Sequence, residues 1–337
     1  MPSVRGFIEK INPWHEEIDH FELILFFLIV ESPPPPPITT GTAVLLLGLY
    51  ALIYVVPFYA SKLTRPSANL SRDAPSVIKG RIRSVAISCI LCCLCTYVIL
   101  IQEAHVAISD ALHLMGVWPV ALVDSARAIF LTVVLFAGPL FSYFLVDGGT
   151  SEWLKLEPLK DLWEEWTTWR NIIAGPITEE VLFRTASVPL MLIARTPIRQ
   201  TIFLSPVVFG LAHFHHFYEF RLTNPAVPLA AALLRSLFQL AFTTLFGAYA
   251  TFAYLRTGSL LAVCAVHSFC NCMGPPRVWG RVAPAPTAAR RDEERSTGWT
   301  VAYYLLLVSG AVLWWKNLWA WTESANALVP TSAFRGA

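Results

Sequence analysis

Long apolar runs, separated by short polar segments, constrain this chain more than any other feature of its sequence. A membrane-spanning helix needs about 20 mainly apolar residues, and several runs approach or exceed that length. Charged residues make up only 14% of the chain, whereas soluble domains carry about 25%. The candidate runs are Thr42–Ala60, Ser84–Ile101, Pro119–Val146, Asn171–Arg195, Thr201–His213, Pro228–Leu255, Ser259–Asn271 and Thr300–Trp321. We therefore predict an all-α fold, a polytopic membrane helix bundle of roughly seven or eight helices.

The sequence outside these runs predicts the domain limits and the orientation. Residues 1–41 form an N-terminal, proline-rich arm that we expect to be poorly ordered or interfacial, and residues 322–337 form a C-terminal tail. Residues 42–321 are then one membrane-embedded domain. The loop 61–83 carries six basic residues against Asp73 alone, so the positive-inside rule places it in the cytosol. A net charge of only +2 does not indicate nucleic-acid binding.

The apolar run Asn171–Arg195 carries three ionisable residues in its middle, Glu179, Glu180 and Arg184. Each charged residue inside a membrane helix costs at least about 2.5 kcal/mol on insertion scales, so these three need partners or a function. Glu180 and Arg184 are spaced i,i+4 and can pair on one helix face. Glu179 points about 100° away from Glu180 and is free for another task.

Two later apolar runs also carry polar side chains at helical spacing. His213 ends one of them, and His267 and Asn271 lie four residues apart in the other, so that both project from one helix face. Polar groups on three neighbouring segments predict a polar cavity inside the membrane.

Several kinds of chemistry fit this set of residues. A buried carboxylate such as Glu179 can take a proton from water with help from a histidine, while His267 and Asn271 donate hydrogen bonds to an oxyanion. Glu179, His213 and His267 could instead bind zinc as a metal-dependent membrane protease does, although no H-E-x-x-H helix is present. A Cys270 nucleophile, a proton-coupled transporter and a non-catalytic scaffold held together by buried polar residues are the remaining alternatives.

Three motifs in this chain resemble the signatures of a known family. They are Glu179-Glu180-Val-Leu-Phe-Arg184, Phe209-Gly-Leu-Ala-His213 and His267-Ser-Phe-Cys-Asn271. They are similar to those of the CAAX prenyl protease 2 family, the Ras- and a-factor-converting enzymes. This family lies within the intramembrane glutamate proteases, which also include bacteriocin-processing homologues. Flanking sequence, such as residues 169–176 and 71–79, extends the likeness over about residues 40–320.

The resemblance implies a role for each motif residue. Glu179 would activate water together with His213, and His267 and Asn271 would form the oxyanion hole. Glu180 and Arg184 would support the site and bind the C-terminal segment of the substrate. No cofactor and no metal ion is implied, since the family's activity is not considered to need zinc.

The resemblance also implies the substrates and the location. The enzyme would remove the last three residues from C-terminal CAAX tails already farnesylated or geranylgeranylated on their cysteine. Ras-like small GTPases and prenylated pheromone precursors would be its partners, together with the lipid bilayer. The expected location is the endoplasmic reticulum membrane, with an active site that is accessible from the cytosol.

Overall fold

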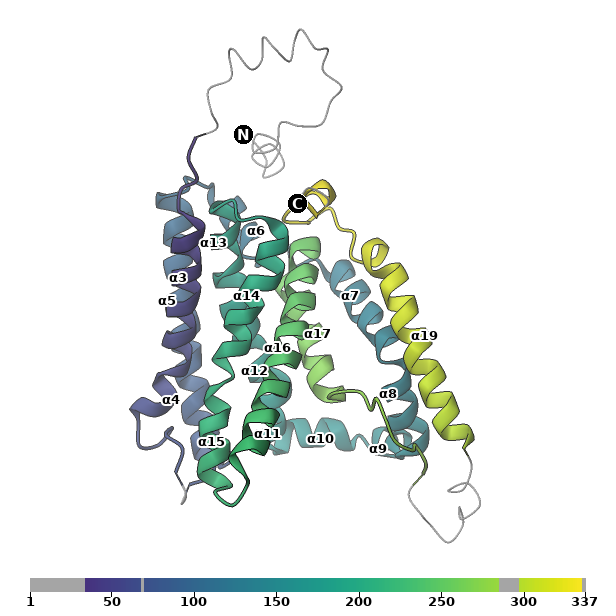
Figure 1. Cartoon of the computed structure of the whole chain (residues 1–337). Coiled ribbons are helices and arrows are strands. Elements are labelled where there is room, and N and C mark those ends of the chain that lie inside the picture. The colour runs from purple at the N-terminus through teal and green to yellow at the C-terminus, as the bar shows by residue number, and fades with distance from the viewer. Residues whose placement is uncertain (1–33, 68–69, 285–296, 335–337) are drawn as a thin grey trace.

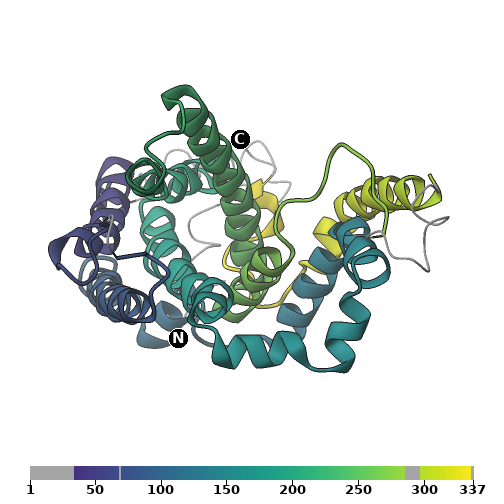
Figure 2. The same ribbon diagram turned by 90° about the horizontal axis from the view of Figure 1, so that it is seen from below.

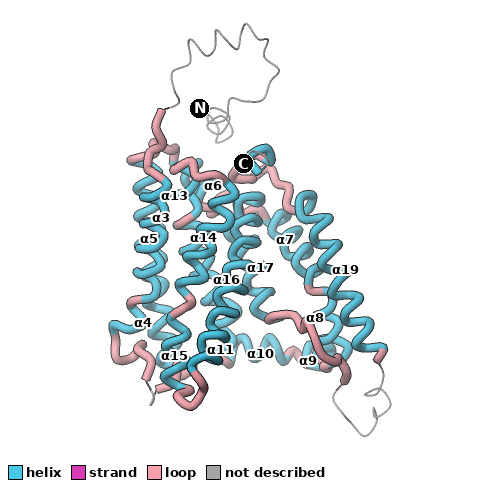
Figure 3. The backbone as a smooth tube through the Cα atoms, in the orientation of Figure 1, coloured by secondary structure: helices cyan, strands magenta, loops and turns pink. Residues whose placement is uncertain are grey.

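Helices joined by short loops account for nearly all of the ordered structure (Figures 1 and 3). The computed structural model describes residues 34–67, 70–284 and 297–334. Within these ranges the β-structure is limited to an isolated bridge between Ser67 and Leu70. The all-α prediction is therefore confirmed. Residues 1–33, most of the predicted N-terminal arm, lie outside the described part of the chain.

Four helices of the described chain are long and apolar enough to cross a membrane, and a bent pair makes a fifth candidate. At about 1.5 Å per residue, the 28 residues of α5 extend about 42 Å, more than the roughly 30 Å hydrocarbon core. The four are α3 (Thr40–Val55) continued by α4 (Pro57–Ala60), α5 (Pro75–Gln102), α16 (Leu229–Thr257) and α19 (Gly298–Trp321). The pair is α7 (Leu122–Leu135) with α8 (Ala137–Phe141) and the π-helix η1 (Ser142–Val146), bent by 75°. The chain is a multi-pass membrane protein.

Exposed apolar side chains cover the outer faces of the long helices. On α5 they include Ile87, Ile90 and Leu94, and on α16 they include Leu234 and Phe238. Apolar surface on this scale is rare on soluble monomers and marks a face that contacts lipid or another apolar partner.

Shorter helices fill the interior between the long ones. The helix α14 (Ile198–Ala212) packs along α16 and also contacts α3, while α17 (Leu260–Met273) packs against α7 and α16. The helix α6 (Ile108–Leu114) follows α5 at the upper end of Figure 1. These interior helices bring residues from distant parts of the sequence into contact.

Four short helices lie at the lower end of the bundle in Figure 1. The chain crosses beneath the long helices through α9 (Gly149–Leu154), α10 (Glu157–Glu164) and α11 (Trp166–Trp169), as Figure 2 shows from below. The polar helix α15 (His215–Thr223) follows α14 at the same end. Lys79 at the start of α5 lies 4.4 Å from the centre of the Trp166 ring, which fixes α11 against the first basic loop.

The segment that carries the two glutamates contains two π-helices between α-helical stretches. It runs from α11 through the π-helix η2 (Arg170–Ala174), then α12 (Gly175–Glu180), the π-helix η3 (Val181–Ala186) and α13 (Val188–Ile193). π-Helical turns are rare, and they occur often at functional sites, where they rotate side chains away from regular α-helical positions. Both glutamates lie on the one α-helical stretch between the two π-helices.

The residues after α19 return to the bundle. The amide of Leu328 donates to the Leu255 carbonyl at the end of α16, and Arg256 binds the hydroxyls of Thr322 and Thr331. A short 3-10 helix, η4 (Thr331–Phe334), ends the described chain. This segment packs against the end of α16 that lies away from the two glutamates.

Candidate active site

Three helices bring Glu179 and two histidines together. Glu179 Oε2 on α12 lies 3.7 Å from His213 Nε2, immediately after α14, and 3.8 Å from His267 Nε2 on α17. The two histidines are separated from the glutamate by 34 and 88 residues of sequence, so only the packing of the helices creates this group. A carboxylate facing two imidazoles is an arrangement suited to proton transfer.

The other nitrogen of each imidazole is held by an oxygen. His213 Nδ1 donates to the carbonyl of Phe209 at 2.9 Å, and His267 Nδ1 donates to Glu180 Oε1 at 2.6 Å. Both oxygens can only accept, so each Nδ1 carries a proton. The Nε2 atoms are therefore left to face Glu179, and they can accept a proton or, in a charged ring, donate one.

Glu180 and Arg184 form a buried pair behind the site. Their side chains are 0% and 1% exposed, and Arg184 Nη1 donates to Glu180 Oε1 at 3.0 Å. Arg184 Nη2 donates to the Gly247 carbonyl at 3.1 Å, and the guanidinium lies 4.9 Å from the centre of the Phe209 ring. Arg184 is thus fully engaged inside the protein and does not reach the cavity that Glu179 faces.

Asn271 lies one helical turn beyond His267 on α17. Its side-chain amide donates to the backbone carbonyl of Asn171 at 2.9 Å. Unlike the buried His267, Asn271 is exposed and lines the same cavity as Glu179. Of the two residues of this motif, His267 therefore lies next to Glu179, and Asn271 lies at the cavity wall.

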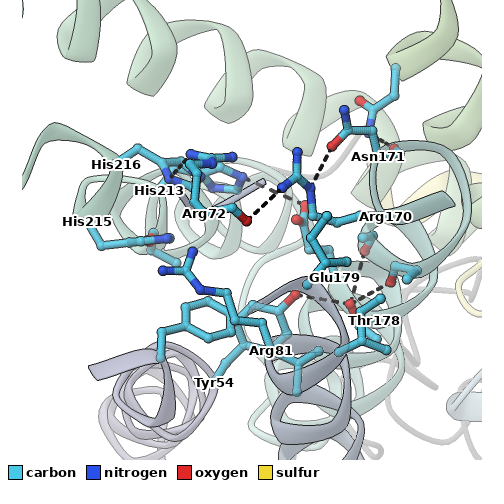
Figure 4. A pocket seen from close by; sticks show the side chains of 18 of the residues that line it. Tyr54, Arg72, Arg81, Arg170, Asn171, Thr178, Glu179, His213, His215 and His216 are labelled. Carbon is cyan, nitrogen blue, oxygen red and sulfur yellow. Dashed lines mark hydrogen bonds and ion pairs between the residues drawn. The ribbon is translucent and has the colours of Figure 1, made fainter. Parts of the chain in front are cut away.

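A cavity of about 180 Å³ opens beside Glu179. Glu179 and His213 line it, as Figure 4 shows, and so does Asn271, whereas His267, Glu180 and Arg184 are not part of its lining. The structure therefore places all six residues singled out in the sequence at one site, in two layers. The cavity combines these polar side chains with a lining surface that is mainly apolar.

Several cavity residues were not singled out as site residues in the sequence. Tyr54 and Thr178 share a hydrogen bond of 3.0 Å at one wall. The lining also includes three arginines, Arg72, Arg81 and Arg170. Two of these, Arg72 and Arg81, belong to the basic loop that the positive-inside rule assigns to the cytosol. Counting charges in the sequence therefore identified this loop as basic, but it did not indicate that the loop lies close to Glu179.

Glu219 on α15 joins this basic loop to the second motif. Its side chain is almost fully buried and lies 2.7 Å from Arg81 Nη2, 3.1 Å from Arg72 Nη1 and 3.2 Å from His216 Nδ1. Burial alone would oppose its ionisation, but the hydrogen bond from His216 and the charge of Arg81 outweigh it and lower the pKa of Glu219 to about 2.

Burial lowers the pKa of His215 to about 4 and that of His216 to about 3.

The distances between possible ligand atoms test the alternative that this site binds zinc. Among the described residues, the potential ligand group whose atoms all lie within 4.8 Å is His215, His216 and Glu219, not Glu179 with His213 and His267. Two guanidinium groups already bind Glu219, and their charge opposes a cation there. Neither group of residues therefore fits a zinc site of three protein ligands.

Comparison with known proteins identifies relatives of this chain. A family model described as type II CAAX prenyl endopeptidase Rce1-like matches residues 161–273, which contain all six residues of the three motifs. The probable CAAX prenyl protease 2 of Schizosaccharomyces pombe is 34% identical over 277 residues, covering 82% of this chain and 92% of that protein. No solved structure gives a significant match.

An animal and a plant protein are also similar to this chain. The human CAAX prenyl protease 2 is 34% identical over 233 residues, covering 65% of this chain and 68% of that protein. The CAAX prenyl protease 2 of Arabidopsis thaliana is 42% identical over 141 residues, covering 42% of this chain and 43% of that protein.

Proposed function

Since this chain belongs to the CAAX prenyl protease 2 family and is a CAAX prenyl endopeptidase, we propose that it removes the last three residues of prenylated tails with Glu179 as the general base. The contact of Glu179 with both His213 and His267 is the single observation that carries this assignment. A general base must lie within hydrogen-bond reach of the proton it takes, directly or through one water. Distances of 3.7 and 3.8 Å leave Glu179 and the imidazoles close enough to act on one water molecule.

In the proposed reaction, Glu179 takes one proton from water, and the water oxygen attacks the carbonyl carbon of the prenylated cysteine. The carbonyl oxygen becomes an oxyanion as the tetrahedral intermediate forms. Glu179 passes the proton that it took from water to Nε2 of His213, which lies 3.7 Å away. When the intermediate collapses, the C–N bond breaks and His213 Nε2 gives this proton to the leaving amine. The products are a protein that ends in prenylcysteine carboxylate and a free tripeptide.

His267 and Asn271 are the proposed donors to the oxyanion. Because His267 Nδ1 is bonded to Glu180, the ring can donate through Nε2 only when both nitrogens carry protons. The Glu180 carboxylate holds the ring through this bond, and Arg184 in turn binds Glu180. Glu180 and Arg184 are thus positioning residues, and the role of Arg184 is support rather than contact with substrate.

The membrane setting supports a prenylated substrate. A prenyl chain gains roughly 0.8 kcal/mol for each methylene buried in lipid, so it holds the neighbouring peptide bond at the membrane surface. Two of the three arginines that line the cavity, Arg72 and Arg81, come from the basic loop 61–83, which supports a cytosolic opening. We propose the endoplasmic reticulum membrane as the location, and Ras-like small GTPases and prenylated pheromone precursors as substrates.

The test is cleavage of a farnesylated tail peptide and of its unprenylated counterpart by the full chain in membranes, with and without chelator. We expect a tripeptide product from the farnesylated peptide alone and no loss of activity on exhaustive chelation. Activity that disappears with chelator and returns with zinc would favour the metal-dependent alternative. The scaffold alternative is not supported, because membership of an endopeptidase family assigns the chain an activity.

A further inference from the structure

The cavity beside Glu179 holds three arginines, and they differ in how firmly they are engaged. Arg81 is largely buried and binds Glu219 and the Thr64 carbonyl, so its charge is used within the fold. Arg72 binds the buried Glu219 but remains 37% exposed. Arg170 is 21% exposed, and its charged partner is Asp73 at 2.7 Å.

Asp73 is an exposed carboxylate placed between two of these arginines. Its side chain is 52% exposed, and its Oδ1 lies 2.7 Å from Arg170 Nη1 and 3.7 Å from Arg72 Nε. Exposed ion pairs of this kind contribute about 0–1 kcal/mol, so an incoming carboxylate can replace Asp73 at little cost. The arrangement is a carboxylate-binding site that is closed by a replaceable carboxylate of the protein itself.

The position of Arg170 matches the length of the segment that is removed. Arg170 precedes Glu179 by nine residues on one continuous helical run that begins with the π-helix η2, so the α-helical rise of 1.5 Å per residue sets an upper bound of about 13.5 Å on their backbone separation. An extended tripeptide spans about 10 Å. The side chain of Arg170 covers the remaining few ångströms, and Arg72, Arg170 and Glu179 all point into the cavity (Figure 4).

Asn171 connects this arginine site to the catalytic residues. Its side-chain oxygen accepts from Arg170 Nε at 2.9 Å, and its backbone carbonyl accepts from Asn271. Asn171 therefore sets the position of a carboxylate bound to Arg170 relative to Asn271, the proposed oxyanion donor. Arg184, the other cation considered for the substrate tail, is buried and saturated with partners.

We propose that Arg170, assisted by Arg72, binds the free C-terminal carboxylate of the substrate, and that Asp73 occupies this site in the free enzyme. The inference rests on the proposed function, since it assumes that Glu179 marks the scissile bond. It assigns the selection of a three-residue tail to the spacing between Arg170 and Glu179. An added residue, or a C-terminal amide, would then weaken binding without altering the catalytic group.

The experiment compares farnesylated tail peptides ending in a free carboxylate or in an amide, with the full chain in membranes. We expect wild-type protein to show a KM for the amide about 10- to 100-fold above that for the acid, the range expected for losing a charge-assisted bond. Arg170→Gln should raise the KM for the acid to the level of the amide and leave kcat nearly unchanged. Asp73→Asn should lower the KM for the acid only.

Arg199→Gln is the matched control, because Arg199 is an exposed arginine on α14 outside this cavity. It should leave the KM for both peptides unchanged. Equal KM values for acid and amide in wild-type protein would overturn the inference, even if Arg170→Gln fails to fold, and so would equal changes for both peptides in Arg170→Gln. Failure of wild-type protein to cleave the farnesylated acid at all would refute the proposed function instead.

Discussion

Glu180 accepts a hydrogen bond of 2.6 Å from His267, although the two residues are 87 positions apart. Adjacent glutamates on α12 therefore have different surroundings. Glu179 faces the cavity and two Nε2 atoms, whereas Glu180 is sealed between Arg184 and the far nitrogen of His267. The proposed roles, general base for Glu179 and support of the His267 ring for Glu180, follow from this difference, which yields the first prediction.

Glu179→Gln should lower kcat on a farnesylated peptide by about 10²- to 10⁴-fold, the usual contribution of a general base. The thermal unfolding midpoint should change little, because this side chain is partly exposed and no ion pair holds it closer than 3.7 Å. Activity and unfolding of the detergent-purified protein would be measured together. Full activity in this variant would contradict its assignment as the base.

Glu180→Gln, unlike Glu179→Gln, should clearly lower the stability of the folded protein. Removing one partner from a buried ion pair costs about 3–5 kcal/mol, because Arg184 is left buried without its carboxylate. We expect a clearly lower unfolding midpoint, and a second loss from Arg184→Met that is smaller in the Glu180→Gln background than in wild-type protein. Strictly additive losses would show that the two side chains are not coupled.

Asn271→Ala tests the oxyanion donor separately from the base. Removing one such donor typically lowers kcat by about 10²- to 10³-fold. Because Asn271 is exposed and contacts only the Asn171 carbonyl among the bonds described here, the unfolding midpoint should stay near that of wild-type protein. A change confined to KM would instead assign Asn271 to substrate binding.

Gly247→Ala should disturb the support of the site from a different helix. A methyl group at this position would lie 2.8 Å from Pro206 Cβ and 3.3 Å from Arg184 Nη2, so α16 and α14 would have to separate. Overpacking of this kind costs about 1–3 kcal/mol. Thermal unfolding measures the loss, with Gly48→Ala as the control, because a methyl group there meets no atom within 4 Å.

Stability should fall as the pH drops below about 6.5. His215 and His216 stay neutral in the folded protein because burial lowers the pKa of each, to about 4 and about 3, whereas the unfolded chain takes up protons near pH 6.5. The pKa of Glu219 is lowered to about 2, so its contribution is complete above about pH 4.5 and is lost only in stronger acid. Between pH 7 and pH 5 the histidines alone should set the trend.

His216→Asn should flatten this pH dependence of the unfolding midpoint, and His105→Asn should not, because His105 is exposed. Unfolding of both variants at pH 7 and pH 5 provides the measurement. An unchanged slope in His216→Asn would mean that other groups carry the trend.

The sequence by itself determined the helical membrane class, the three polar segments and the pairing of Glu180 with Arg184. These follow from local properties, because apolar length sets a span and helical repeat puts i and i+4 on one face. The same repeat separated the directions of Glu179 and Glu180. All six motif residues were identified this way.

Only the tertiary structure decided which partners these residues meet. In the folded chain, Glu180 has a second partner in His267. Arg184 does not line the cavity, whereas Arg72 and Arg170 do. The tertiary structure also brought His216 into contact with Glu219, which binds Arg72 and Arg81 of the basic loop. Contacts between helices depend on how their faces pack across the bundle, and neither periodicity nor charge counting within one segment contains that information.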